Sequence, residues 1–153
     1  MGGPDNRTQR IAMGMFSDAA PLESTLQELL ASAIAPQQLC LVGCGSRVES
    51  LLRSEQLTAP IQRHLDLHNL RTIATLANGA LLVAAPDSFA CLDFEREREA
   101  QGLLHGVEKM LIDGVLALLV KARTLTEFAA VTRLLLRYSS YHVRTREVVW
   151  PRA

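Results

Sequence analysis

Aromatic residues and cysteines are scarce in this sequence, and charge of neither sign predominates. Aromatic residues make up 5% of the 153 residues, and there are three cysteines. Lysine plus arginine number 16 and aspartate plus glutamate number 16, so the formal net charge is zero. Modules that bind nucleic acids need a basic excess to neutralise phosphates. We therefore expect no nucleic-acid partner.

Long apolar runs are also missing. Every apolar run is far shorter than the ~20 residues that cross a bilayer, so we expect no membrane partner. Residues 1–9 are polar and glycine-rich, without the apolar segment of a secretion signal, and we expect them to form a flexible N-terminal arm. An odd number of cysteines (Cys40, Cys44 and Cys91) favours reduced thiols over a disulfide framework. These features together predict a cytoplasmic protein.

Two stretches of the chain, 10–43 and 114–149, follow one plan. Each combines an apolar strand-like run, an amphipathic helix and a second strand-like run. The first comprises Arg10–Phe16, Leu22–Ile34 and Leu39–Gly43, and the second comprises Val115–Lys121, Leu125–Tyr138 and His142–Val149. Helix residues Leu26, Leu29 and Leu30 recur at a constant offset of 105 as Val131, Leu134 and Leu135. Thr124 with Glu127 forms a capping box that opens the second helix.

The segment between these units, about 46–111, reads as a helical insert with one strand. Ser46 and Glu49 form a capping-box pattern, which predicts a helix from near Arg47 to about Gln56. Asn78-Gly79 lies between two apolar runs, as in a two-residue hairpin. The second run is a buried strand near 80–85. The first, Thr72–Ala77, is either its hairpin partner or the end of a helix capped at Gly79, and we favour the helix end. A further helix runs from the Pro86 loop to about Leu111, with Gly102 and Gly106 inside it.

A pair of strand–helix–strand units folds readily as an α+β domain of the ferredoxin-like type, with both units in one sheet. We expect a single domain over 10–153. The strands at 11–16, 80–85 and 115–120 are apolar on both faces, so both faces of the sheet need cover. The middle helices or a second subunit would supply it, and we expect a homo-oligomer, most simply a dimer.

Three segments resemble small heat-induced or general stress proteins of bacteria. They are I-A-M-G-M-F-S-D (11–18) with P-Q-Q-L-C-L-V (36–42), G-A-L-L-V-A-A-P (79–86), and D-G-V-L-A-L-L-V (113–120) through L-L-R-Y-S-S-Y-H-V-R-T-R-E-V (135–148). The resemblance implies a ferredoxin-like fold and a stress-linked role. It carries over no catalytic residue. The chain departs from the family pattern at 47–70, which lacks a Gly/Ala-rich middle, and at Asp113-Gly114, where Gly-Gly is usual.

The segment Gly43-Cys44-Gly45-Ser46-Arg47 lies between a strand and a helix start. Free N–H groups at a helix N-terminus favour anions, and glycines let a phosphate approach the backbone. The pattern is half of a dinucleotide fingerprint, since Val48 takes the place of the third glycine. One hypothesis is that Gly43, Gly45, Ser46 and Arg47 bind an anion or a nucleotide. The alternative is a glycine turn that leads into the Ser46 cap.

Arg144 and Arg146 are two positions apart in the last strand, so both side chains project on the same face. Together they could bind a carboxylate or a phosphate. The alternative is a solvated face, or pairing with acids of the 93–99 run such as Glu95, Glu97 and Glu99. The acids and bases are unevenly distributed: residues 87–113 hold seven acids and three bases, and residues 121–153 hold seven bases and two acids. These regions could compensate each other within or between subunits.

Residue patterns for catalysis and metal binding are weak. His64 and His68 would share a helix face at a spacing that binds zinc, but a third ligand is missing. Cys91 with His105 is the one thiol pairing considered as a nucleophile, and nothing in the sequence singles it out. We predict no metal site, no catalytic residue and no cofactor. The leading hypothesis is a non-enzymatic, self-associating domain with a stress or regulatory role, and the alternative is a small-molecule binding protein.

Overall fold

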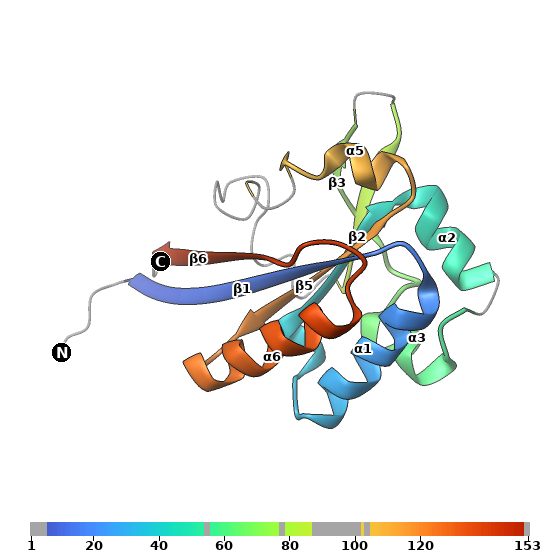
Figure 1. Ribbon diagram of the computed structural model, residues 1–153. Helices are drawn as coiled ribbons and strands as arrows, with labels where there is room; N and C mark the ends of the chain where they lie inside the picture. The colour runs from blue at the N-terminus through green and yellow to red at the C-terminus, as the bar shows by residue number, and fades with distance from the viewer. Residues whose placement is uncertain (1–5, 54–55, 77–78, 87–101, 103–104, 152–153) are drawn as a thin grey trace.

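The computed structural model describes residues 6–53, 56–76, 79–86, 102 and 105–151, with side chains from residue 10 to residue 145 of these ranges. They form an α+β structure around one sheet (Figure 1). The elements in chain order are β1 (Asn6–Phe16), α1 (Ala19–Ala31), the short 3-10 helix η1 (Pro36–Gln38), β2 (Leu39–Cys44), α2 (Gly45–Arg53), α3 (Ala59–Leu65), β3 (Arg71–Thr75), β4 (Leu81–Ala85), α5 (Glu108–Ile112), β5 (Leu116–Ala122), α6 (Leu125–Tyr138) and β6 (Arg144–Pro151).

The sheet has six strands in the order β3-β4-β2-β5-β1-β6, and every neighbouring pair is antiparallel. Strand β1 pairs with β5, from Arg10 opposite Ala122 to Phe16 opposite Leu116. The prediction that 11–16 and 115–120 are strands of one sheet is confirmed. Each strand–helix–strand unit is split, because β5 lies between β1 and β2, and β1 lies between β5 and β6.

Both faces of the sheet are buried, as the apolar strands predict. Helices α1, α2, α3 and α6 cover one face, and their buried residues form a core with Phe16, Leu41 and Leu118. The other face carries Ile11, Met13 and Leu119, and α5 packs on that side (Figure 1). The alternation of the two cores along each strand follows from the period of two in a β-strand.

The duplication is real, but its offset is 106 residues rather than 105. The helix caps Asp18 and Thr124 are 106 positions apart, as are the strand ends Phe16 and Ala122. Leu29 therefore corresponds to Leu135, and both are buried. Leu30 and Leu134, which the shorter offset assigns to the buried stripe, are only partly buried. The predicted cap is confirmed at Thr124, whose Oγ1 accepts a hydrogen bond from the Glu127 N–H at 3.0 Å. The reciprocal bond of a capping box is replaced, because Glu127 Oε1 accepts from the Arg123 N–H rather than from the Thr124 N–H.

Two predictions about strand limits are wrong. Residues 6–9 belong to β1, where they pair with 148–151 of β6, so the predicted flexible arm is at most 1–5, which lies outside the described residues. Residues 71–75 are strand β3 rather than a helix end, and they pair with β4. The Leu76 N–H donates to the Ala80 carbonyl at 2.8 Å, which closes the hairpin, and Gly79 has the positive φ of 86° that hairpin turns require.

Two predictions about helix limits are also wrong. Helix α2 begins at Gly45, directly after β2, so Ser46 lies inside its first turn and is not the cap. The capping-box pattern failed because the chain turns from strand to helix without a loop. Of the helix predicted up to Leu111, residues 87–101, 103 and 104 lie outside the described residues. Gly106 lies in a turn just before α5 rather than inside a helix.

Helix α1 ends in a Schellman motif with an unusual residue. The Ile34 N–H donates to the Leu29 carbonyl at 3.1 Å, and the Ala33 N–H donates to the Leu30 carbonyl at 3.2 Å. Ala33 therefore has a φ of 66°, in the left-handed region that glycine normally occupies at this position. The predicted helix limit at Ile34 was too late because this turn, rather than Pro36, ends the helix.

Replacing Ala33 by glycine is expected to raise the free energy of unfolding by about 0.5–1 kcal/mol. Glycine removes the steric cost of the left-handed backbone, which exceeds the entropy it adds to the unfolded chain. Urea denaturation would measure the change. Ala31→Gly, in the last turn of the same helix, is the matched control and should be destabilising by a similar amount. A loss of stability in both variants would contradict the assigned turn.

Candidate functional site

The glycines of the predicted anion site have a packing role. A β-carbon at Gly43 would lie 2.8 Å from Leu116 Cδ2 and 3.5 Å from Val48 Cγ2, so glycine is what lets β2 and α2 approach β5. Gly45 is the first residue of α2. Neither glycine is among the residues with positive φ. The structure explains Gly43 without a ligand.

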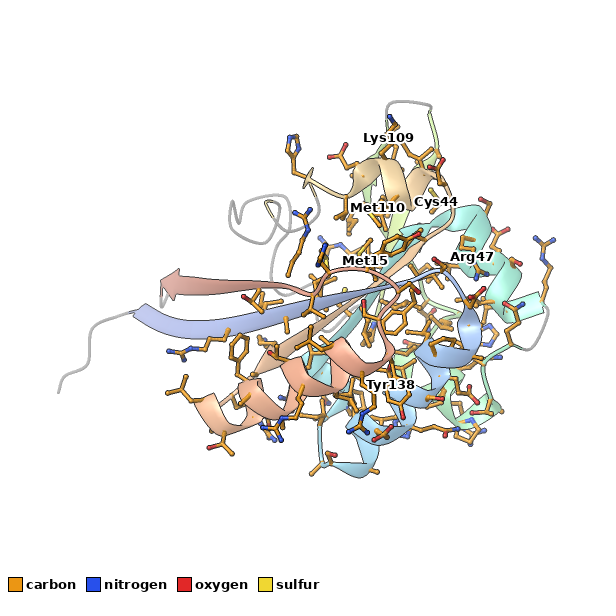
Figure 2. All side chains as sticks on the ribbon, in the orientation of Figure 1. Met15, Cys44, Arg47, Lys109, Met110 and Tyr138 are labelled. Atoms are coloured by element: carbon orange, nitrogen blue, oxygen red, sulfur yellow. The ribbon has the colours of Figure 1, made fainter. Side chains whose placement is uncertain are left out.

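Arg47 holds α2 to the turn that precedes β5. Its Nε donates to the Gly114 carbonyl at 3.0 Å, and its Nη1 lies 3.5 Å from Gln56 Oε1. Figure 2 shows Arg47 on α2, at the side of the molecule where β2 ends. Gly114 has a φ of 97°, which suits the sharp turn whose carbonyl Arg47 binds. The guanidinium is therefore used inside the fold, while Ser46 beside it is exposed.

Arg144 and Arg146 lie at a different place in the sheet. Their backbones are opposite Met13 and Ile11 of β1, which carry the core on the α5 side. Arg144 is exposed, and its Nη1 would be 2.8 Å from a β-carbon at Gly106, so its guanidinium lies against the turn before α5. The side chain of Arg146 and residues 93–99, including the expected partners Glu95, Glu97 and Glu99, lie outside the described part.

The backbones of the six predicted ligand-binding residues lie at two separate places in the fold. Strands β5 and β1 separate β2, which ends at Gly43 and Cys44, from β6, which carries the two arginines. Three strand spacings of about 4.8 Å put these strands about 14 Å apart. The two described arginines are held at these separate places, since Arg47 binds the Gly114 carbonyl and Arg144 lies against Gly106.

The two described thiols are buried and protonated. Cys40 and Cys44 are free cysteines of β2. Burial raises the pKa of both thiols, and for Cys40 the hydrogen bond with Ala85 offsets this only in part. Cys44 Sγ donates to the Leu111 carbonyl at 3.0 Å, which ties α5 to the sheet. A nucleophilic cysteine needs a lowered thiol pKa, so these two are structural.

The histidine arrangements considered in the sequence do not form sites. Helix α3 ends at Leu65 with Asp66 in the left-handed region, so His68 lies outside the helix and does not share a face with His64. Within the described residues, no group of three His, Cys, Asp or Glu side chains could hold a metal ion. His105 is exposed, and its Nδ1 lies 3.4 Å from Glu108 Oε1. Its proposed partner Cys91 is outside the described residues.

A cleft between α1 and α6 was not foreseen from the sequence. It has a volume of about 360 Å³ and is lined by apolar and polar residues in equal number, with Glu28 and Glu127 among the polar ones. Both carboxylates are already engaged. Glu28 accepts the hydroxyl of Tyr138 and lies 3.7 Å from Arg137 Nη1, so it joins α1 to α6.

Glu127 is the centre of a second polar cluster. Its Oε1 accepts hydrogen bonds from Gln38 Nε2 at 2.7 Å and from the Arg123 N–H at 2.8 Å, and its Oε2 lies 2.9 Å from Arg123 Nη2. Gln38 is buried and also binds the Lys121 carbonyl at 2.9 Å. The cluster fastens η1 and the end of β5 to the start of α6. With both acids satisfied by protein groups, the cleft offers no free charge to a ligand among its described residues.

The two edges of the sheet differ in how well they are protected. Edge strand β3 has five residues and a break in register between Thr72 and Ala74. Edge strand β6 has eight residues and pairs with β1 in unbroken register from Arg144 to Pro151. Bulges and short length are common means of blocking further strand pairing, and β6 has neither.

The β1–β6 pair also extends beyond the rest of the sheet. Pairing of β1 with β5 starts at Arg10, so 6–9 and 148–151 form a two-stranded ribbon (Figure 1). A two-stranded ribbon is marginally stable without further strands or a packing partner. Together, the open edge of β6 and this ribbon form the best candidate interaction site in the described structure.

Comparisons with models of protein families, with curated proteins and with solved structures found no match. The similarity to bacterial stress proteins thus stays a prediction from the sequence. Among the described helices, none is both long and apolar enough to cross a membrane.

Proposed function

We propose that this chain is a non-enzymatic domain that self-associates through its sheet and serves a stress-linked or regulatory role in the bacterial cytoplasm. The observation that carries the proposal is the open β6 edge with its two-stranded ribbon. A surface made of strand edge binds polypeptide by main-chain hydrogen bonds. The expected partner is a second copy of the chain, which gives a dimer.

We also propose that the fold is ferredoxin-like. The proposal is supported by the strand order β2-β5-β1-β6, in which the two strand–helix–strand units interleave, and by the position of α1 and α6 on the same face. This is the arrangement of two split units in that fold. The hairpin β3–β4 would then be an addition at one edge.

The stress-linked role and the compartment rest on different features. The role rests on the segments 11–18, 36–42, 79–86, 113–120 and 135–148, which resemble bacterial stress proteins. The compartment rests on cysteine use, since Cys40 and Cys44 are free thiols. Free buried thiols are common in proteins of reducing compartments.

Light scattering of the purified chain over a range of concentrations tests the self-association. We expect a mass of twice the 16.8 kDa of the monomer. A monomer at all concentrations would refute the proposal. The same samples should be melted with inorganic phosphate and with nucleotides, to test the alternative of an anion site at Gly43 and Gly45. A ligand at about 100 times its Kd stabilises by ~2.7 kcal/mol, so a raised melting temperature would favour that alternative.

A further inference from the structure

We infer that two copies of the chain join through the outer edges of their β6 strands, antiparallel and centred on Val148, so that the two sheets become one continuous sheet. This inference rests on the proposed self-association and names the surface and the register that would produce it. It commits to one partner, a second copy of this chain.

The choice of edge follows from the pairing of the strands. In the described part of the chain, no strand pairs with the outer side of β6. Its eight residues keep a regular register with β1, so its outward backbone groups are regularly spaced for another strand up to Pro151, which has no N–H. Strand β3, at the opposite edge, is shorter and its register is interrupted between Thr72 and Ala74.

The choice of partner follows from the two-stranded ribbon. Residues 148–151 of β6 have 6–9 on one side and no strand beyond them. In a β6-to-β6 pair centred on Val148, the ribbon of each copy lies beside residues 145–148 of the other. Each two-stranded ribbon thereby becomes part of a sheet in which β1 and β6 of one copy continue into β6 and β1 of the other. Pairing with a second copy thus supplies the further strands that a two-stranded ribbon needs for stability. An unrelated peptide would add one strand only.

The register follows from symmetry and charge. Two identical antiparallel strands in one sheet are related by a two-fold axis perpendicular to the sheet, so one residue must lie opposite its own copy. Centring on Thr145 sets Arg144 opposite Arg146, and centring on Arg146 or Glu147 sets that charge opposite itself. Like charges directly opposite are destabilising. Centring on Val148 avoids these contacts and pairs seven residues, 145–151, on each strand.

Charge substitutions at the two-fold axis test this register. Val148→Lys and Val148→Glu each place two like charges opposite each other, so each variant should scatter light with the mass of a monomer. Mixing the two variants places a lysine opposite a glutamate and should restore the dimer mass. Val149→Lys, one position along, lies opposite Glu147 of the partner subunit and should remain a dimer. Circular dichroism of each variant checks that it is folded.

The outcomes separate the inference from the proposed function. A wild-type monomer refutes both. A wild-type dimer in which Val148→Lys and Val148→Glu both stay dimeric refutes the β6 interface and leaves self-association standing. Folded monomers of both variants that do not restore a dimer when mixed refute the Val148 register. If the chain binds an unrelated peptide at this edge instead, the wild type alone is a monomer, and the inference fails.

Discussion

Replacing Leu135 by alanine is expected to lower the free energy of unfolding by about 2–5 kcal/mol, the range for a fully buried leucine. Leu135 is 0% exposed and lies on the inner face of α6. Its Cδ2 would be 2.9 Å from a β-carbon at Gly14, so it packs directly on the bare backbone of β1. Gly14 has no side chain to move into the space, and the cavity would stay open. Urea denaturation of the variant measures the loss.

Leu136→Ala is the matched control for this prediction. Leu136 is the next residue of the same helix and is 64% exposed. The same chemical change should therefore alter stability by less than about 0.5 kcal/mol. Equal losses in the two variants would mean that the buried face of α6 is assigned wrongly, and with it the packing of the second unit on β1.

Replacing Glu127 by glutamine is expected to lower the free energy of unfolding by about 2 kcal/mol. Hydrogen bonds to charged groups contribute about 1.5–3 kcal/mol, and the neutral amide cannot accept the same set of bonds. The Glu127 side chain is 16% exposed, and its carboxylate accepts bonds from Gln38 and Arg123. Glu49→Gln is the control, because Glu49 is 64% exposed and lies 3.8 Å from Arg53. Surface ion pairs of that kind contribute little.

The difference in unfolding free energy between the wild type and Glu127→Gln should become smaller at acid pH. Burial raises the pKa of this carboxyl, but hydrogen bonds from Arg123 and Gln38 and the charge of Arg123 outweigh it, so the net pKa is below the ordinary value of 4.5. A lowered folded-state pKa gives stability that is present above the unfolded pKa and is lost as pH falls through the folded pKa. The wild type should therefore lose its advantage over Glu127→Gln progressively as the pH falls below the ordinary carboxyl pKa of 4.5 and through the lowered pKa of the folded state. A difference that stays constant with pH would contradict this assignment.

The sequence predicted the parts of the fold that have strong local signals. Residues 11–16 of β1 and 116–120 of β5 are apolar throughout, and the Thr124 cap has its Glu127 partner three residues on, so both were found. Strand β3 was missed because its five residues are mostly exposed and lack an apolar alternation. The adjacent Asn78-Gly79 pair, which is typical of a hairpin, predicted this strand better than the apolar pattern of residues 72–77 did. Strand order was open in the sequence, since it depends on which strands meet across the chain.

The candidate site was predicted less well, because its residues serve the fold. Gly43 fits the pattern of a phosphate-binding loop, but the structure requires glycine there because a β-carbon would meet Leu116. The sequence alone does not distinguish these two reasons for a glycine. Arg47 looks free until its hydrogen bond with Gly114, 67 residues away, is known. The Gln38–Glu127 bond joins residues 89 positions apart, and the Tyr138–Glu28 bond between α6 and α1 joins residues 110 positions apart. No local pattern reveals such pairs. The open edge of β6 likewise becomes visible only with the strand order.

The interleaving of the two units bears on how the chain is made. Strand β1 has only β5 and β6 as neighbours, and Arg10 pairs with Ala122 and with Glu147. Strand β1 is therefore completed by two strands, β5 and β6, that follow it much later in the chain. A loop of about one hundred residues, from Phe16 to Leu116, must close before the β1–β5 ladder forms, which slows folding. Until β5 and β6 have been synthesised, the apolar residues 11–16 of β1 lack their sheet neighbours, and exposed apolar segments of this kind are what chaperones of nascent chains bind.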